Sequence, residues 1–287
     1  MCAVGTGPGD LRDEARIPTT SPAETLARAV AFFREPHGAP LRALGIATFG
    51  PVDLDPRSPT WGVITSTPKP GWADTDLAGP FRRALAVPIA VDTDVNGAAL
   101  AEYRWGAAQG DDPVVFVTVG TGVGGGVLVA GRPVHGVVHP EMGHVRVPRD
   151  RQHDPFPGAC PYHGDCLEGV ASAGAMRQRW GVPPEALPPD HPGWELEAHY
   201  LALGLAAVVA VLSPRRIVIG GGVIGQSSLL PRVRARLRDL LGGYPRSTAL
   251  ADMDRYLVAP ALGERAGVLG ALALAEDALA SPRVPRG

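Results

Sequence analysis

Residues 114–129 hold two runs of β-branched residues joined by a dense glycine turn. Gly120, Gly122 and Gly125 match G-x-G-x-x-G, which in a dinucleotide-binding unit must open a helix. Here Val127–Ala130 continues as a strand, so that context is missing. The segment is therefore predicted to be a strand–turn–strand hairpin. Such a turn can present backbone N–H groups and a threonine hydroxyl to a phosphate, and the alternative is a glycine-rich turn without a ligand.

Strand and helix patterns alternate along the rest of the chain. Ser21-Pro22-Ala23-Glu24 is a capping box that opens a helix to about Phe33. The run Leu44–Phe49 reads as a buried strand ended by Gly50-Pro51. Further strands are expected at 88–92 and 216–219, and further helices at 76–85, 95–105, 167–180, 194–212, 228–241 and 264–280. This alternation predicts an α/β protein.

The composition is that of a folded chain rather than a disordered one. Of 287 residues, 45% are hydrophobic and 20% charged, and the net charge of −2 offers no basic field for nucleic acid. The apolar run Leu201–Leu212 is too short to span a bilayer, and Met1–Gly5 does not resemble a signal peptide. Three cysteines do not form a disulfide framework. We therefore expect a cytoplasmic protein with no membrane or nucleic-acid partner.

A cluster of metal-binding residue types follows the second half of the hairpin. Cys160, His163 and Cys166 have C-x-x-H-x-x-C spacing, which lets three ligands share one tetrahedral ion, and zinc suits a mixed sulfur and nitrogen set. A closed site with a fourth ligand would be structural, since it leaves no position for water. The alternative is a thiol pair without a metal. Candidates for the fourth ligand are His135, His139, His144 and His153.

Carboxylates occur where an α/β fold places its chemistry. Asp94 and Asn96 follow a short strand and open a helix. Asp94 could serve as the helix N-cap or as a reactive group, and Asn96 has the donor and acceptor that suit sugar hydroxyls. Glu141 and Glu168 flank the proposed metal loop, and the alternative for each is an ordinary surface carboxylate.

Taken together, these segments resemble the ROK family of sugar kinases, and within it the bacterial zinc-containing fructokinase branch. They occur in the family's order over nearly the whole chain. The matching segments are 45–51, 64–69, 92–102, the glycine hairpin, His139-Pro-Glu-Met-Gly-His144, 160–169 and Ile217–Gly222.

The resemblance implies an actin-like ATPase (ribonuclease H-like) fold, with two α/β domains around a cleft. Residues 1–112 would form the smaller domain, against which the last helix, 264–280, would pack. Residues 113–263 would form the larger domain with the zinc loop. A homodimer is also implied.

The resemblance also implies the activity and the residues that carry it. The chain would phosphorylate a hexose with MgATP, most simply D-fructose to fructose 6-phosphate, with Asp94 as general base. The sugar would contact Gly50, Pro51, Asn96, Glu141, His144 and Glu168. ATP would contact Thr118, Gly120, Thr121, Gly122, Gly220, Gly221 and Gly222. Structural zinc would be held by His144, Cys160, His163 and Cys166.

Alternatives of the same and of other classes remain at this stage. A glucokinase or mannokinase would share the fold, as would a sugar-binding protein with impaired catalysis. A sugar-sensing regulator would need an N-terminal helix-turn-helix, which the sequence does not predict.

Two positions depart from the family pattern. Residue 93 is Thr, where many glucokinases carry Asn, and in this the chain resembles the fructokinase branch. The family opens with a strand carrying Asp-Gly-Gly-Thr-Lys, whereas Met1–Gly5 resembles the strand after it. We expect a start placed late rather than a loss of activity.

Overall fold

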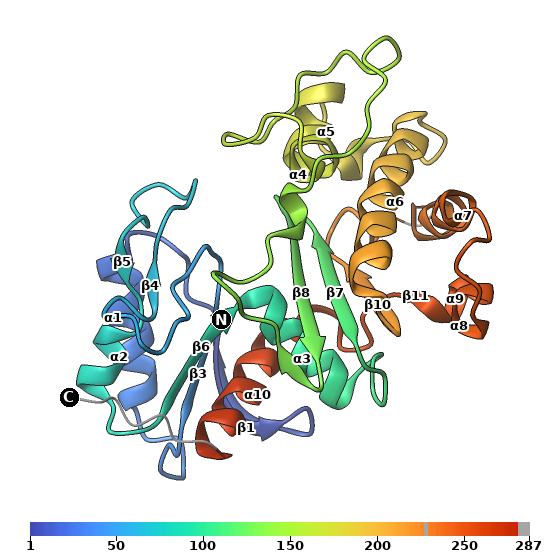
Figure 1. The fold of residues 1–287 in the computed structure, drawn as a ribbon. Helices are drawn as coiled ribbons and strands as arrows, with labels where there is room; N and C mark the ends of the chain where they lie inside the picture. The colour runs from blue at the N-terminus through green and yellow to red at the C-terminus, as the bar shows by residue number, and fades with distance from the viewer. Residues whose placement is uncertain (227–228, 281–287) are drawn as a thin grey trace. The chain divides into compact units, whose positions relative to one another are not determined.

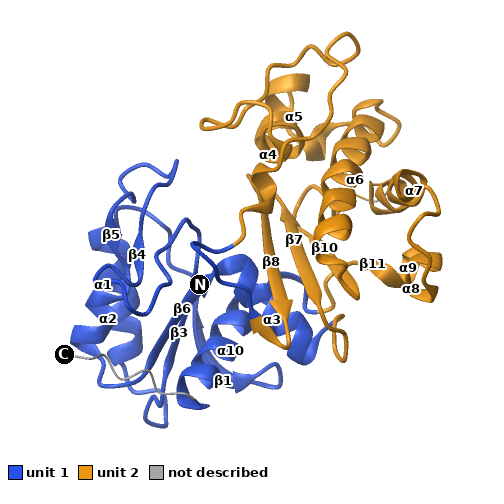
Figure 2. Ribbon diagram, viewed as in Figure 1, with its two compact units in different colours: residues 1–106, 133–139, 262–287 blue, residues 107–132, 140–261 orange. Residues whose placement is uncertain are grey.

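The computed structural model describes residues 1–226 and 229–280, and the chain divides into two compact units (Figure 2). Unit 1 comprises Met1–Gly106, Pro133–His139 and the segment from Leu262 onward, and unit 2 comprises Ala107–Arg132 and Pro140–Ala261. The chain first passes from unit 1 to unit 2 after Gly106, whereas the expected domain boundary was after residue 112. Residues 133–139, expected in the larger domain, belong to unit 1.

The strands in the described part of unit 1 form three pairs. Strands β1 (Cys2–Gly7) and β2 (Asp10–Ala15) make an antiparallel hairpin, and β4 (Val63–Ile64) pairs with β5 (Thr75–Asp76). Strand β3 (Leu44–Thr48) runs parallel to β6 (Ile89–Thr93), in a register that sets Thr48 opposite Thr93. The expected strands at 44–49 and 88–92 are therefore confirmed, whereas β2 was not predicted.

The described residues of unit 1 also form the helices α1 (Pro22–Arg34), α2 (Gly79–Ala84), α3 (Asp94–Trp105) and α10 (Ala266–Ala280). The Ser21 hydroxyl accepts a hydrogen bond from the Glu24 N–H, as the capping box predicted. Helix α10 packs against α3 and β3, so the end of the described chain supports its first half (Figure 1). A β-carbon on Gly45 would lie 1.8 Å from the Ala271 carbonyl oxygen, so this contact requires glycine.

Unit 2 contains a five-stranded sheet with the order β11-β10-β7-β8-β9. Strands β7 (Val114–Val119), β10 (Arg216–Gly220) and β11 (Leu257–Val258) are parallel, and β8 (Val123–Val129) is antiparallel to β7. The edge strand β9 is Arg132–Pro133. The predicted glycine hairpin is thus β7 and β8, and the predicted strand at 216–219 is β10.

The helices of unit 2 are α4 (Leu167–Ala171), α5 (Ala173–Trp180), α6 (Gly193–Leu212), α7 (Leu229–Leu241), α8 (Thr248–Ala251) and α9 (Met253–Tyr256). The single helix expected at 167–180 is two helices, because Ser172 ends α4 and its hydroxyl caps α5 through the Ala175 N–H. Residue 228, the expected start of the next helix, lies outside the described residues. Helix α7 packs along α6 (Figure 1).

Helix α6 is longer than the apolar run seen in the sequence. An 18-residue window of this 20-residue helix has a mean hydropathy of 1.6, so the helix is long and apolar enough to cross a membrane by length and composition alone, whereas the run Leu201–Leu212 was expected to be too short. Half of that window is buried within the protein. A core helix meets the same criteria, and α6 has α7 and α4 packed on it.

Candidate functional site

In unit 1, the predicted site residues Gly50, Pro51 and Asp94 follow the carboxyl ends of two parallel strands. Strand β3 ends at Thr48, and Gly50 and Pro51 follow it. Strand β6 ends at Thr93, and Asp94 is the first residue of α3. Because Thr48 and Thr93 are register partners, both turns leave the same edge, which is where open α/β sheets bind ligands.

The N-cap of α3 is Thr93, not Asp94. The Thr93 hydroxyl accepts a hydrogen bond from the Asn96 N–H at 3.1 Å, which leaves the Asp94 carboxylate free of the capping role. Asp94 is solvent-accessible, yet protein displaces much of the water around its carboxylate, and this desolvation raises its pKa. The N–H of Val95, 2.9 Å from Oδ1, and the charge of Lys69 oppose that rise.

Asn96 is turned into the protein rather than outward. It is 1% exposed, and its Nδ2 donates to Oδ1 of Asp92 at 2.7 Å. The N–H of Thr93 donates to the same oxygen at 2.8 Å. This burial favours an indirect role for Asn96 over direct contact with a sugar. Asp92 itself was not predicted as a site residue, although it directly precedes the Thr93-Asp94 pair.

Two histidines that the sequence offered as metal ligands lie in unit 1 instead. His135 Nε2 is 2.9 Å from Oδ2 of Asp92. His139 is buried, its Nε2 accepts a hydrogen bond from the Val52 N–H at 3.2 Å, and its ring lies against Gly50. Pro133–His139 thus contacts both strand-end turns of unit 1. Spacing alone could not reveal this, because the partners lie 43 and 87 residues away.

In unit 2, the predicted nucleotide residues gather at the carboxyl edge of β7 and β10. Thr118 in β7 is the register partner of Gly220, the last residue of β10. The turn Gly120–Gly122 joins β7 to β8, and Gly221 has a φ of +101° that favours glycine. A β-carbon on Gly221 would also lie 2.3 Å from the Val119 carbonyl oxygen. The residues brought together here are Thr118, Gly120, Thr121, Gly122, Gly220, Gly221 and Gly222.

Glu168 links this glycine turn to the metal-binding loop. Its Oε2 accepts a hydrogen bond from the Val123 N–H at 3.0 Å and lies 2.5 Å from the position that a β-carbon on Gly122 would take. Glu168 stands in the first turn of α4, two residues after Cys166. Glu141 is exposed, and its Oε2 is 3.9 Å from His144 Nε2. Glu141, His144 and Glu168 therefore all belong to unit 2.

Four side chains of unit 2 point donor atoms at one position. The Nδ1 atoms of His144 and His163 are 3.2 Å apart, Cys160 Sγ is 3.7 and 3.6 Å from them, and Cys166 Sγ is 3.5 Å from His144 Nδ1. Tetrahedral zinc with ordinary bond lengths separates two nitrogens by about 3.3 Å, and a sulfur from a nitrogen by about 3.6 Å. These distances fit a closed metal site with His144 as fourth ligand. His153, the remaining candidate, pairs with Asp150.

The two thiols of this cluster are buried, so forming thiolates there costs free energy unless a cation compensates the charge. Burial, together with the neighbouring Cys160 and Glu168, raises the pKa of Cys166 to about 11. Burial also lowers the pKa of His144, helped by His163 and opposed by Glu168. A bound metal would compensate for the buried thiolates, because metal ligands bind in their deprotonated forms.

A buried ionic network holds the loop before these ligands. Asp154 accepts from Arg149 at 2.7 Å, from Tyr200 at 2.6 Å and from Arg179 at 3.2 Å. Burial raises the pKa of Asp154, but the Tyr200 hydroxyl and the two guanidinium groups more than offset it, so the pKa lies below its usual range. The network joins the loop to α5 and α6.

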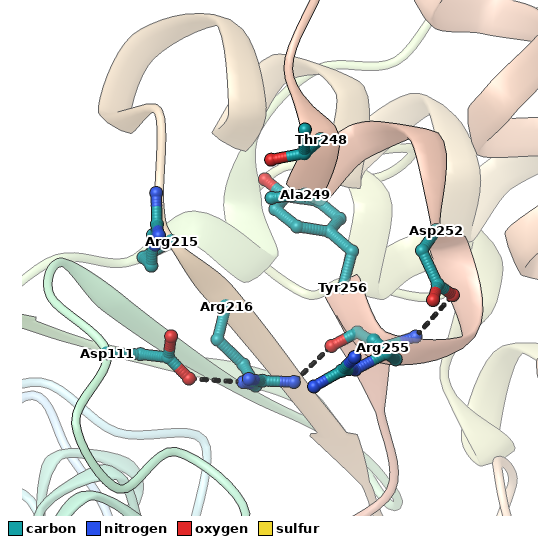
Figure 3. Close-up of a pocket in the computed structure, with 8 residues that line it drawn as sticks. All are labelled: Asp111, Arg215, Arg216, Thr248, Ala249, Asp252, Arg255 and Tyr256. Carbon is teal, nitrogen blue, oxygen red and sulfur yellow. Dashed lines mark hydrogen bonds and ion pairs between the residues drawn. The ribbon is translucent and has the colours of Figure 1, made fainter.

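A cavity of about 360 Å³ opens elsewhere in unit 2, beside the amino end of β10. Figure 3 shows Arg216 between the Asp111 carboxylate and the Arg255 carbonyl, and Asp252 at the Arg255 N–H. None of the predicted site residues lines it; its lining is Asp111, Arg215, Arg216, Thr248, Ala249, Asp252, Arg255 and Tyr256. The cavity lies at the end of β10 opposite to Gly220.

Comparison with known proteins identifies the family. The sequence profile of the ROK family matches residues 1–278. The chain belongs to the ROK family. A fructokinase of Zymomonas mobilis is 47% identical over 268 residues, which are 91% of this chain and 87% of that protein.

Two ROK structures show the same fold, the actin-like ATPase fold. A ROK hexokinase from Thermus thermophilus matches with a TM-score of 0.78 and 27% identity, over 97% of this chain and 95% of that one. A ROK glucokinase from Streptomyces griseus, in complex with glucose and AMPPNP, matches with a TM-score of 0.68 and 27% identity, over 89% and 86%. The fold class expected from the sequence is therefore confirmed.

Proposed function

We propose that this chain is an ATP-dependent sugar kinase that converts D-fructose to fructose 6-phosphate. The observation that carries the reaction type is the junction of β6 and α3, where Asp94 offers an accessible carboxylate that capping does not use. The choice of sugar is supported by the 47% identity with a fructokinase, against 27% with the glucose-bound kinase.

Asp94 acts as general base in this proposal. It accepts the proton of the sugar hydroxyl as that oxygen bonds to the γ-phosphorus, while the bond to the β,γ-bridging oxygen breaks and ADP leaves. Desolvation raises the pKa of Asp94, which makes it a better proton acceptor than an ordinary aspartate.

The glycine edge of unit 2 binds the nucleotide. Gly120–Gly122 presents backbone N–H groups to the phosphates, and Gly220–Gly222 lies beside the adenosine. Mg²⁺, when bound with ATP, would neutralise charge that develops on the phosphates. Thr118 adds a hydroxyl next to Gly220 at the end of the neighbouring strand.

The proposed sugar contacts in unit 1 are the backbone groups of Gly50 and Pro51. The proposed sugar contacts in unit 2 are the side chains of Glu141, His144 and Glu168. Asn96 does not contact the sugar directly in this proposal, because its amide is buried; it acts through its hydrogen bond to Asp92. Glu168 also accepts the Val123 N–H beside the turn Gly120–Gly122, so in this proposal one carboxylate both contacts the sugar and holds the turn that binds the phosphates.

Zinc is the metal that we propose for His144, Cys160, His163 and Cys166. The mixed nitrogen and sulfur donors and their near-tetrahedral spacing favour it over magnesium or calcium. When bound, it would supply a structural cross-link between the 3₁₀ turn η1 (Met142–His144), the 160–166 loop and the start of α4. All four positions are filled by protein, so zinc does no chemistry on the sugar.

ADP release with MgATP tests the function, with fructose, glucose and mannose supplied in parallel. Fructose should give the highest kcat/KM. A preference for glucose or mannose would replace the fructokinase assignment with the other kinases of the family. Absence of turnover on all three sugars, with sugar binding retained, would identify an impaired sugar-binding protein.

Two further expectations accompany this proposal. The resemblance implies a homodimer, which light scattering of the purified chain checks directly. A cytoplasmic location fits an enzyme that consumes ATP, and fractionation of cells that express the chain tests it.

A further inference from the structure

The carboxylate of Asp92 is the buried centre of the β6–α3 junction. It is 2% exposed and accepts hydrogen bonds from the Thr93 N–H, from Asn96 Nδ2 and from His135 Nε2, at 2.8, 2.7 and 2.9 Å. A carboxylate has no proton to donate, so Nε2 of His135 must carry the hydrogen. One oxygen thus holds the first turn of α3, and the other is held by His135.

His135 reaches this junction from a distant segment, Pro133–His139, which we call the strap. At its other end, His139 Nε2 accepts from the Val52 N–H, so its hydrogen is on Nδ1. The two histidines fasten the strap to both turns that carry predicted site residues, His135 as a donor through Nε2 and His139 as an acceptor through Nε2. Val137 and Val138 between them are exposed, so burial of apolar surface does not hold that part of the strap.

The general base lies inside the segment that Asp92 fixes. Asp94 stands between Thr93 and Asn96, and both of these donate to Asp92. A change in the Asp92 carboxylate would turn the first residues of α3 and with them the Asp94 side chain. Small displacements matter here, since about 1 Å of misplacement can reduce a rate by about 100-fold.

We propose that His135 is a positioning residue for phosphoryl transfer: it holds Asp92, which fixes the first turn of α3 and so directs Asp94 at the sugar hydroxyl. This inference rests on the proposed function, because it assigns His135 to the base of that reaction. His135 is suited to this role because about a third of its side chain is exposed while Asp92 is buried, so it closes the junction from the solvent side.

Steady-state kinetics of three variants test the proposal. His135→Ala removes the donor and should lower kcat/KM for fructose by roughly 10- to 100-fold, mostly in kcat, with KM for ATP changed less than about twofold. His135→Gln keeps an N–H donor and should recover activity to within about fivefold of wild type. His199→Ala, on α6 in unit 2, is the matched control and should retain wild-type rates.

A pH profile separates positioning from loss of packing. Without the His135 donor, the negative charge of Asp92 is less compensated, so the pKa of nearby Asp94 should rise and the acid limb of kcat/KM should move to higher pH. Lys69, whose charge lowers the pKa of Asp94, is unchanged in every variant. His135→Gln should return the limb to its wild-type position.

Two kinetic results would contradict a positioning role for His135. His135→Ala within twofold of wild type, or His135→Gln as impaired as the Ala variant, would show that the hydrogen bond does not position the base. If thermal melting shows the Ala variant to be unfolded, His135→Asn, whose shorter side chain does not reach Asp92, replaces it.

Nuclear magnetic resonance of ¹⁵N-histidine makes the hydrogen bond testable without turnover. A proton on Nε2 of His135 supports the contact, and a proton on Nδ1 alone overturns it. A wild-type chain that shows this proton but phosphorylates no sugar would refute the proposed function and leave the contact intact.

Discussion

The imidazole of His139 fills the space that a side chain on Gly50 would need. A β-carbon at Gly50 would lie 3.0 Å from Cε1 and 3.1 Å from Nε2 of that ring, closer than ordinary van der Waals contact. The same Nε2 accepts the Val52 N–H, so the ring also fixes the turn two residues further on. The predicted sugar contact at Gly50 is therefore shaped by a histidine 89 positions later in the sequence.

Gly50→Ala should raise KM for fructose by roughly three- to tenfold, since displacing the His139 ring costs about 1 kcal/mol. KM for ATP should stay near its wild-type value. Gly9→Ala is the control, because no atom lies within 4 Å of the place that its β-carbon would take and its φ is not positive. Equal sugar kinetics in the two variants would contradict the role of the His139 ring.

Asp94→Asn should lower kcat by about 10²- to 10⁴-fold with little change in metal content, because it removes the proton acceptor but keeps the shape. The wild-type acid limb should lie above the ordinary aspartate pKa, since desolvation raises the pKa of Asp94 and the base works only when deprotonated. Activity is then lost as the pH falls through that raised value. A near-normal rate for Asp94→Asn would remove Asp94 from the role of base.

Metal analysis should find about one zinc per chain, and Cys160→Ser should lose most of it. The melting temperature should fall by at least about 5 °C, because three segments of unit 2 lose their cross-link. Cys2→Ser is the control: Cys2 is a half-buried thiol in unit 1 and should keep both metal and stability. Purified wild-type chain with no bound metal would contradict the proposed zinc site.

Glu197→Gln should stabilise the fold increasingly as the pH rises. Both carboxylate oxygens of Glu197 are buried without a hydrogen-bond partner in the described part of the chain, and burial raises its pKa well above the usual range, partly opposed by Arg179. The native state therefore holds a proton that the unfolded chain releases at about pH 4.3, so wild-type stability falls as the pH rises above that value towards the native pKa.

Urea unfolding at pH 5 and at pH 8 measures this difference. Glu195→Gln is the control. Glu195 lies on α6 like Glu197 but pairs at the surface with Arg232 and Arg236 of α7. This substitution should change the free energy of unfolding by less than about 1 kcal/mol. An effect of Glu197→Gln that is the same at both pH values would show that Glu197 does not titrate in this range.

Gly122→Ala should weaken fructose binding through Glu168. The added β-carbon would lie 2.5 Å from Oε2 of Glu168, so that carboxylate must move and give up the Val123 N–H. We expect KM for fructose to rise by roughly tenfold, about the effect of one lost hydrogen bond to a charged group. Gly120→Ala has open space around its β-carbon and should leave KM for fructose unchanged. Equal KM values for fructose in the two variants would exclude this steric route.

Local patterns predicted the parts of the site that are local in sequence. The glycine hairpin, the strands expected at 44–49 and 88–92, and the C-x-x-H-x-x-C spacing could be predicted because the residues of each lie close together in the sequence. The choice between Thr93 and Asp94 as N-cap could not, since both residue types cap helices well.

Contacts between distant segments could not be predicted from one sequence. His135 and His139 looked like metal ligands because they precede the cysteine loop, and only the fold shows that the strap belongs to unit 1. Ser172 splits a helix that periodicity extends without a break, because a serine both ends one helical segment and caps the next.

The interleaving of the two units sets an order for folding during synthesis. Unit 2 lies between Ala107 and Ala261, so its sheet can close once residue 261 has left the ribosome. Unit 1 begins first but cannot finish, because α10 supplies the surface against which β3 and α3 pack. The amino-terminal part of the nascent chain therefore remains incompletely folded, with some of its apolar surface exposed to solvent, until α10 has been synthesised.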